Sequence, residues 1–314
     1  MANSKKVLLD NHGISGNWRA EFDRSAQSYT IDSILEYIEQ HNLENVVVVD
    51  NTASATFVQQ YPRFVTAGFD IVSSNKVANT ISYDFYSSLR ALLRQKGKTF
   101  LYETNVGAGL PLVDTIRQLH HSGDKILRIR GVFSGTLSYI FNHFSEEDRL
   151  FYDILREAMD KGLTEPDPRE DLCGNDVARK LLILAREIDL HSEFSDIRIE
   201  NLIPEPLRSG TVEDFLSGAD LLNSEYGKRK AALAPDEVLR YVGDLDAVAG
   251  TLEVKLVQVK KATPLGSLRG SDSMFEIYTE SYGEKPGVIQ GAGAGAAVTA
   301  RGVYTDLLRL SEAL

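Results

Sequence analysis

The chain has 314 residues, enough for about two domains, and its 43% hydrophobic and 25% charged residues are typical of a globular protein with a sizeable core. The net charge of −11 and the scattered positions of the 34 basic residues argue against a nucleic-acid partner, because proteins that bind phosphate backbones gather lysine and arginine on one face. The single cysteine excludes an internal disulfide, no histidine pair has zinc-ligand spacing, and no apolar run approaches the about 18 residues of a membrane span, so we expect a cytoplasmic protein without a structural zinc ion or a membrane partner.

The first hundred residues alternate between helices and short apolar strands. Apolar residues recur at helical spacing in 31–42, 54–67 and 81–95. Strands are predicted between and after these helices, at 45–50, 69–74 and 98–104. Alternation of this kind implies βαβ units and a parallel, doubly wound sheet.

The pattern changes after Pro111, and the remaining chain is predicted to be α+β with a sheet of its own. Helices are expected at 113–123, 136–144, about 148–161, about 175–188 and about 295–312. Strands are expected at 125–134, 238–245, 251–260, 274–281 and 287–291, where apolar and polar residues tend to alternate. The polar stretch 204–236 is the least predictable part of the chain.

Two glycine-rich segments, 104–111 (TNVGAGLP) and 291–302 (GAGAGAAVTARG), follow a predicted strand and precede a predicted helix. Neither is a convincing G-x-G-x-x-G, so we expect these glycines to permit close backbone approach rather than to grip a pyrophosphate. A dinucleotide-binding domain normally opens with a strand, a glycine-rich turn and a helix. The first clear strand of this chain lacks such a turn, so either the fold binds no dinucleotide or its first unit lies upstream of Met1.

The most informative stretch is 158–180, AMDKGLTEPDPREDLCGNDVARK, in which acids, prolines and glycines lie close to Lys180 in the sequence. Asp176 and Lys180 are four residues apart on a predicted helix, so they share a face, although such a pair is ordinarily a solvated ion pair. Asp176 falls in the first turn, where the helix dipole favours a carboxylate. Pro166 favours an extended conformation for Glu165, which suits a side chain directed into a cleft.

Several segments together resemble the homoserine dehydrogenase family, and most closely the dehydrogenase region of bifunctional aspartate kinase–homoserine dehydrogenases. The resemblance rests on 104–111, on 134–142 (SGTLSYIFN) and above all on 162–180; the segments 50–54 (DNTAS), 74–80 (SNKVANT) and 291–300 also fit. It implies an NAD- or NADP-dependent oxidoreductase that interconverts L-aspartate 4-semialdehyde and L-homoserine in threonine and methionine biosynthesis. It also implies a homodimer that pairs through the sheet of the substrate domain.

The resemblance also implies roles for individual residues. The catalytic residues would be Lys180 as proton donor, Asp176 as its partner, and Lys76. Substrate would be bound by Glu165, Asp171 and Asp176, with Glu165 holding the amino group. The cofactor would contact Thr52, Ser54, Lys76, Gly162 and Gly295, and a monovalent cation such as Na⁺ would lie on the main-chain oxygens of Glu103, Val106, Ala108 and Leu110.

For some of these residues a structural role is an open alternative. Lys76 is also interpretable as a surface lysine, Glu103 as a strand-end carboxylate and Asp171 as a local cap. An aspartate-semialdehyde dehydrogenase would need a cysteine nucleophile, and Cys173, the only candidate, lies inside the motif of the other family.

The expected architecture is α/β: an incomplete Rossmann-type parallel sheet that lacks its first glycine-rich βα unit, plus an α+β substrate and dimerisation domain. The division would be 1–110 with 293–314 for NAD(P), and 111–292 for substrate and dimerisation. The hypothesis from the sequence is an N-terminally shortened homoserine dehydrogenase region that binds the dinucleotide weakly. The alternative is an inactive or scaffolding dimeric fragment that has lost cofactor binding.

Overall fold

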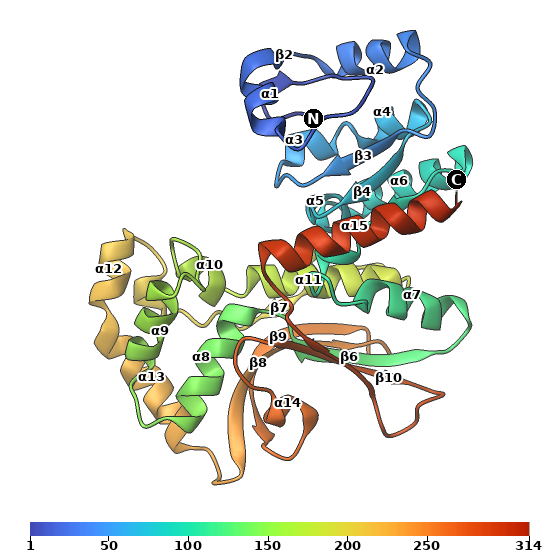
Figure 1. Ribbon diagram of the computed structural model, residues 1–314. Coiled ribbons are helices and arrows are strands. Elements are labelled where there is room, and N and C mark those ends of the chain that lie inside the picture. Colours follow the sequence, from blue (N-terminus) through green and yellow to red (C-terminus); the bar gives the residue numbers. More distant parts are fainter. Residues whose placement is uncertain (314) are drawn as a thin grey trace.

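The computed structural model describes residues 1–313 and has two parts, each with its own sheet (Figure 1). In the first part, β3 (Val47–Asp50), β4 (Asp70–Ser73) and β5 (Phe100–Leu101) pair in parallel, with β4 in the middle. The helices of this part are α2 (Ile31–Gln40), α3 (Ala55–Val58), α4 (Tyr61–Thr66), α5 (Val77–Thr80) and α6 (Tyr83–Lys96). The predicted parallel α/β sheet beside a second, α+β part is confirmed.

Before this sheet, β1 (Lys6–Val7) and β2 (Gln27–Ser28) form a small antiparallel pair with α1 (Trp18–Ser25) between them. Within residues 1–313, β3 pairs only with β4, so its other edge is open and faces α2 and the N-terminal residues.

The single helix predicted at 54–67 is wrong, because the chain forms α3 and α4 with a turn at 59–60 between them. Pro62 lies in the first turn of α4, where the missing N–H of proline costs nothing, whereas inside a longer helix it would break a hydrogen bond. The strand predicted at 98–104 is likewise shorter, since β5 ends at Leu101 and Glu103–Asn105 forms a 3₁₀ turn.

The helix α15 (Ala296–Ala313) packs on the first sheet although it follows that sheet by about two hundred residues (Figure 1). Val303 and Leu310 of α15 form one apolar cluster with Val72 of β4 and Leu101 of β5. The Asp306 carboxylate also accepts a hydrogen bond from the Glu103 main-chain N–H at 2.9 Å. The helix therefore supplies part of the core of the parallel sheet.

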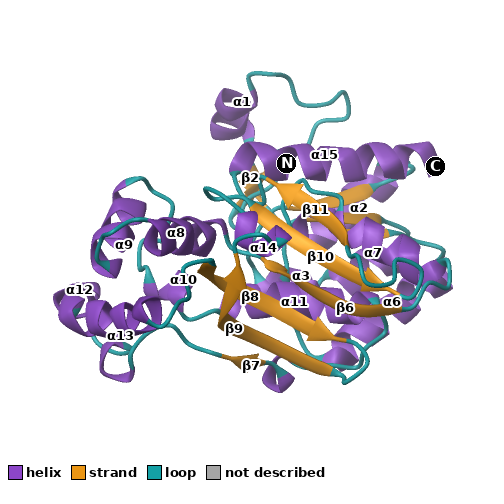
Figure 2. Ribbon diagram, turned by 90° about the horizontal axis from the view of Figure 1, so that it is seen from below, coloured by secondary structure: helices purple, strands orange, loops and turns teal. Residues whose placement is uncertain are grey.

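The second sheet has six strands in the order β11-β10-β6-β8-β9-β7 (Figure 2). Its strands are β6 (Ile126–Val132), β7 (Arg198–Ile199), β8 (Glu237–Asp246), β9 (Thr251–Lys260), β10 (Ser273–Thr279) and β11 (Gly287–Gly291). All neighbours are antiparallel except β7 and β9. The antiparallel strands were predicted from sequence; the two-residue strand β7 was not.

Helices surround this sheet: α7 (Leu112–His121), α8 (Gly135–Glu146), α9 (Phe151–Asp160), α10 (Arg169–Leu172), α11 (Asn175–Glu187), α12 (Val212–Ser217), α13 (Ala219–Ala231) and α14 (Pro264–Ser267). The stretch 204–236 that resisted prediction forms α12 and α13. Among residues 1–313, no helix is both long and apolar enough to cross a membrane.

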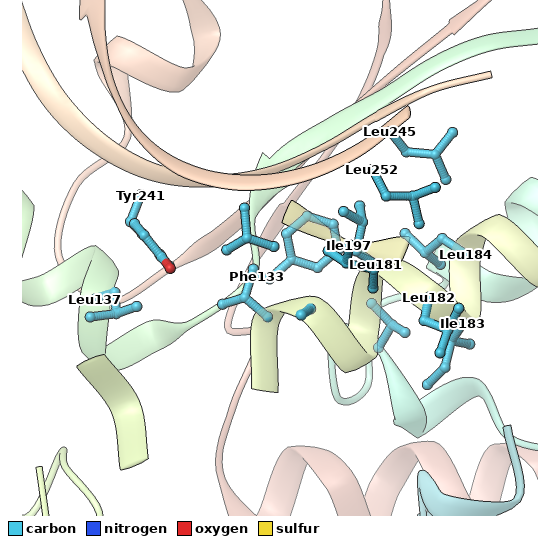
Figure 3. Packing of buried hydrophobic residues seen from close by; sticks show 14 of the residues in the cluster. Phe133, Leu137, Leu181, Leu182, Ile183, Leu184, Ile197, Tyr241, Leu245 and Leu252 are labelled. Atoms are coloured by element: carbon cyan, nitrogen blue, oxygen red, sulfur yellow. The ribbon is translucent and has the colours of Figure 1, made fainter. Parts of the chain in front are cut away.

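The helix α11 joins the two parts, because it packs on β8 and β9 of the second sheet and on α5 of the first part. Leu181, Leu182, Ile183 and Leu184 follow one another on this helix and all are buried, so α11 is enclosed on every side in its middle turns. Figure 3 shows Leu181 beside Phe133 and Leu184 below the strands. This enclosure fixes the position of the polar residues at the N-terminal end of α11.

Candidate active site

The Lys180 ammonium group lies between one side chain and one main-chain oxygen. Its Nζ is 2.7 Å from Asp176 Oδ2 and donates to the Phe133 carbonyl oxygen at 2.8 Å. The Lys180 side chain is only 12% exposed. An ammonium group has three N–H donors, so one remains for a substrate oxygen.

A second lysine reaches the same carboxylate from the other part of the molecule. Lys76 immediately precedes α5, and its Nζ lies 3.3 Å from Asp176 Oδ1. The predicted grouping of Lys76, Asp176 and Lys180 is therefore present as one ion-paired cluster.

The electrostatics of the cluster favour an ionised carboxylate. Burial raises the pKa of Asp176, but the neighbouring Lys180 and Lys76 ammonium groups outweigh this effect and hold the pKa well below its usual range. At Asp176 itself, two ammonium groups share one carboxylate, so both can also attract a further negative oxygen. Such a site is suited to stabilise an oxygen that becomes negative during a reaction.

The predicted substrate-binding acids lie next to this cluster. The Glu165 main-chain N–H donates to Asp171 Oδ2 at 2.8 Å, which fixes the loop, while the Glu165 side chain is exposed. Burial raises the pKa of Asp171, and the carboxylates of Glu165 and Asp176 add to this effect. Three carboxylates thus gather beside two lysines, an arrangement that attracts a substrate carrying both an ammonium group and a reactive oxygen.

Thr52 and Ser54 lie in the turn after β3 and line a cavity of about 790 Å³ beside the open edge of that strand. Ser54 Oγ accepts a hydrogen bond from the Phe57 N–H and so caps α3, and Thr52 Oγ1 accepts one from the Ser54 N–H. Each hydroxyl keeps its own hydrogen to donate to a ligand. The cavity volume falls in the range of about 300–1,000 Å³ that small-molecule sites occupy.

Gly162 and Gly295, the two predicted cofactor glycines, both have positive φ, +67° and +116°. Gly162 follows α9 and Gly295 immediately precedes α15. A Cβ at either position would meet no atom within 4 Å, so there is open space beside both main chains.

The segment predicted to hold a cation is tightly folded. The Glu103 carboxylate accepts hydrogen bonds from the Val113 and Asp114 N–H groups at 2.8 and 2.9 Å, so it caps the N-terminus of α7. Ala108 has φ +53°, and a Cβ at Gly109 would lie 2.8 Å from the Val298 carbonyl oxygen. The expected close backbone approach is therefore present at Gly109. Residues 1–313 contain no group of three or more histidine, cysteine or acidic side chains that could hold a metal ion.

Two contributors to the site were missed by sequence reasoning. Asn75 is 2% exposed, and its Nδ2 donates to Asp50 Oδ2 at 3.0 Å and to the Ser54 carbonyl oxygen at 3.2 Å, which ties β3 to the turn that follows it. Its signal in the sequence is the segment SNKVANT, where Lys76 alone was singled out. The contact of the Phe133 carbonyl oxygen with Lys180 could not be predicted from the sequence, because every residue has a main-chain carbonyl oxygen.

Two protein-family models match the parts of the sequence that form this site. A homoserine dehydrogenase model matches residues 111–308, and a model described as the NAD-binding domain of homoserine dehydrogenase matches residues 2–103. This chain belongs to the homoserine dehydrogenase family. The motif 162–180 and the lysine–carboxylate cluster both lie within the two matched regions.

Curated relatives of the family cover essentially the whole chain. A chloroplastic bifunctional aspartokinase/homoserine dehydrogenase 1 of Zea mays is 42% identical over 318 residues, which is 100% of this chain and 34% of the relative. A homoserine dehydrogenase of Schizosaccharomyces pombe is 39% identical over 300 residues, which is 93% of this chain and 80% of the relative. The chain therefore spans about a third of the bifunctional relatives it matches.

Solved structures agree in fold. A crystal structure of a Candida auris protein of unknown function superposes with a TM-score of 0.91 at 36% identity, over 98% of this chain and 88% of that one. A hyperthermophilic archaeal homoserine dehydrogenase in complex with NADPH superposes with a TM-score of 0.68 at 22% identity, over 94% and 79% of the chains. At 22% identity, the similarity to the archaeal enzyme supports a shared fold only.

Proposed function

We propose that this chain is a homoserine dehydrogenase, which interconverts L-aspartate 4-semialdehyde and L-homoserine with NAD or NADP. The observation that carries the proposal is the Lys180 ammonium group, held at 2.7 Å from Asp176 and 2.8 Å from the Phe133 carbonyl oxygen within the family's motif.

Lys180 is proposed to hold and move the proton of the reaction. When bound, the dinucleotide supplies the hydride for reduction of the aldehyde carbon and accepts it in the reverse direction. Reduction turns the carbonyl oxygen into an alkoxide, and a proton from Lys180 Nζ makes it the hydroxyl of homoserine. In the reverse direction the neutral amine of Lys180 takes that proton back.

Asp176 and Lys76 are proposed to set the charge around this proton transfer. Asp176 orients Lys180 from the preceding helical turn, and Lys76 adds positive charge on the other oxygen of the same carboxylate. Glu165 and Asp171 are proposed to bind the substrate ammonium group, which the three neighbouring carboxylates favour.

The cofactor is proposed to contact Thr52, Ser54, Lys76, Gly162 and Gly295. The cavity beside β3, the free hydroxyl hydrogens and the open main chain at both glycines support this assignment. We propose the corresponding domain division, 1–110 with 293–314 for the cofactor and 111–292 for the substrate, which the packing of α15 on the first sheet supports.

A monovalent cation such as Na⁺ is proposed on the main-chain oxygens of Glu103, Val106, Ala108 and Leu110. The left-handed conformation of Ala108 supports this, since backbone strain is concentrated at functional sites. Replacing NaCl by choline chloride at constant ionic strength should lower the melting temperature; an unchanged value would contradict the cation site.

A homodimer is proposed through the second sheet, whose edge strand β11 carries the exposed Val288. Its test is the molar mass in solution, measured by light scattering during gel filtration. A monomeric mass across the micromolar range would argue against it.

The activity is tested by homoserine-dependent reduction of NADP⁺ and of NAD⁺, followed at 340 nm, with a parallel dinucleotide titration. Lys180→Ala should abolish reduction, whereas Arg179→Ala, the adjacent exposed cation on α11, should retain it. A folded wild-type dimer that neither binds dinucleotide nor reduces it would favour the alternative of a non-catalytic, scaffolding fragment.

A further inference from the structure

A second cavity lies at the opposite end of α11 from Asp176. It has a volume of about 440 Å³, is open to solvent, and is lined by residues of α6, β5, α7 and the C-terminal turn of α11. Five cationic side chains line it: Arg90, Arg94, Lys98, Arg117 and Arg186. Only two acids, Glu187 and Asp189, lie on the same walls, although the whole chain carries a net charge of −11.

Both of these acids already have partners. The Glu187 carboxylate accepts a hydrogen bond from the Tyr102 hydroxyl and lies 3.1 Å from Arg117 Nε. Asp189 lies 2.9 Å from His120 Nε2. Glu187 attracts the nearby Arg90 guanidinium group without contacting it, but two acids still leave the five cations of the cavity in excess.

Two of the cations lack a carboxylate partner. Among residues 1–313, no carboxylate lies within 4.0 Å of Arg90 or Arg94, whereas Lys98 pairs with Asp70 at 3.3 Å. Arg94 is exposed at the mouth and Arg90 is part-buried. A part-buried charge without a counter-ion is costly in free energy unless something else stabilises it.

Aromatic rings supply part of that stabilisation at Arg90. Its guanidinium carbon lies 4.7 Å from the centre of the Tyr86 ring, 5.0 Å from Phe100 and 4.7 Å from Tyr102. Arg90 donates a hydrogen bond to Asn79 Oδ1 at 2.7 Å, and it also interacts with the Tyr86 side chain. A guanidinium group has five N–H donors, so Arg90 keeps donors that can bind a carboxylate or a phosphate.

We propose that this cavity is a binding site for a small anion, a carboxylate or a phosphate, held by the guanidinium groups of Arg90 and Arg94. Tyr83 and Tyr86 also line the cavity. The volume suits a ligand of a few to about twenty non-hydrogen atoms, near the lower end of small-molecule cavities. The site is separate from the proposed catalytic cluster, so its occupancy can be measured whether or not the chain has dehydrogenase activity.

The cavity is connected to the catalytic cluster through α5. Arg90 donates to the side chain of Asn79, and Arg186 of α11 donates to the Asn79 carbonyl oxygen at 3.0 Å. The Asn79 N–H in turn bonds the carbonyl oxygen of Lys76 at 3.0 Å. A ligand that draws Arg90 toward itself therefore acts on the short helix that begins next to Lys76.

The proposal is tested by titrating the 314-residue protein with inorganic phosphate and, separately, with citrate, each against NaCl of the same ionic strength. We expect at least one of the two anions to raise the melting temperature above the NaCl value and to bind in calorimetry. Arg94→Gln should weaken that binding about tenfold or more, because a hydrogen bond to a charged group is lost. Lys96→Gln, with the same charge change on an exposed residue of the same helix outside the cavity, should leave it unchanged.

Arg90→Lys is the second variant, since it keeps the charge and removes the planar fork. It should also weaken binding, and its melting temperature without anion shows whether it folds. A response to phosphate alone identifies a phosphate site and a response to citrate alone a carboxylate site. No response beyond that of NaCl, or equal binding by wild type and Arg94→Gln, would overturn the proposal.

Discussion

The Lys76 ammonium group lies 3.3 Å from the Asp176 carboxylate, and this contact crosses between the two parts of the molecule. Lys76 stands next to α5, beside the parallel sheet, whereas Asp176 lies in the first turn of α11, which packs on the antiparallel sheet. The other oxygen of Asp176 is taken by Lys180. One carboxylate therefore sets the spacing of two ammonium groups that belong to different parts.

Replacing that carboxylate should impair turnover more than stability. Asp176→Asn removes the shared counter-charge and should lower kcat about 100-fold, at the lower end of general acid–base contributions. Because the Asp176 side chain is 46% exposed, solvent screens the ion pairs and the melting temperature should change little. Lys76→Met should lower kcat/KM by a smaller factor in the Asp176→Asn background than in wild type, since both changes break the same contact. Strictly additive losses in kcat/KM would contradict the shared carboxylate.

The pH dependence of stability should reflect Glu103. Burial raises the pKa of Glu103 from 4.5 to about 7, and the N–H groups of Asp114 and Val113 act in the opposite direction. Below pH 4.5 the residue is protonated in both states; as the pH rises toward 7 the unfolded chain releases the proton first, so stability falls, and above about 7 the loss is constant. The full effect on the free energy of unfolding is at most about 3.4 kcal/mol.

This effect is measured by urea unfolding between pH 4.5 and 8. As the pH rises to 7, wild type should become less stable relative to Glu103→Gln, because the glutamate titrates and glutamine does not. Glu44→Gln, at an exposed glutamate, is the control and should show no such trend. A constant difference between wild type and Glu103→Gln would refute the raised pKa.

Gly174, which immediately precedes α11, should tolerate a side chain poorly. It has φ +81°, and an added Cβ would lie 2.2 Å from the Tyr241 hydroxyl oxygen. Gly174→Ala should lower the free energy of unfolding by about 1 kcal/mol because of the left-handed conformation. The overlap with Tyr241 should lower it by about 1–3 kcal/mol more. Gly162 has φ +67° and open space beside it, so Gly162→Ala should lower the free energy of unfolding only by the about 1 kcal/mol of the left-handed conformation.

Denaturant unfolding of both variants separates the two contributions. Tyr241→Phe in the Gly174→Ala background should recover part of the loss, since it removes the overlapping oxygen. Equal destabilisation of the two glycine variants would show that the backbone moves to relieve the contact.

Asn75 should affect cofactor affinity through the turn that it holds. Asn75→Ala frees the Ser54 carbonyl oxygen and should raise KM for NADP⁺ about tenfold or more, since a buried hydrogen-bond network is opened, with a smaller change in kcat. Asn75→Asp places a second carboxylate next to Asp50 and should lower the melting temperature more than Asn75→Ala does. Steady-state kinetics with both variants, at saturating homoserine, test this; an unchanged KM in both would exclude the positioning role.

Much of the architecture could be predicted because the spacing of apolar residues along the sequence determines many of the helices and strands. Apolar spacing predicted α11, in which Val177, Leu181 and Leu184 are buried, and the four-residue spacing placed Asp176 and Lys180 on one face. The alternating segment 251–260 became β9 over the same residues. These elements agree with their sequences because their own side chains determine which surface they bury.

Other features depend on parts of the chain that are far apart. The Lys180 contact with the Phe133 carbonyl oxygen joins atoms 47 residues apart and involves a group that every residue has. The helix α13 carries few apolar residues, and only Leu222 and Tyr226 are buried, so helical periodicity is weak there. The approach of Lys76 to Asp176 follows from the packing of α5 on α11, which no local pattern encodes.

The position of α15 has a consequence for biosynthesis. Glu103 and Asp306, joined by a hydrogen bond, are 203 residues apart, and Val303 and Leu310 complete the cluster around Val72 and Leu101. During translation the parallel sheet therefore emerges with one face uncovered and stays so until nearly the whole described chain has been made. At about 5–20 residues per second this exposure lasts about 10–40 seconds, a period in which chaperones or early folding of the neighbouring part must protect the apolar face.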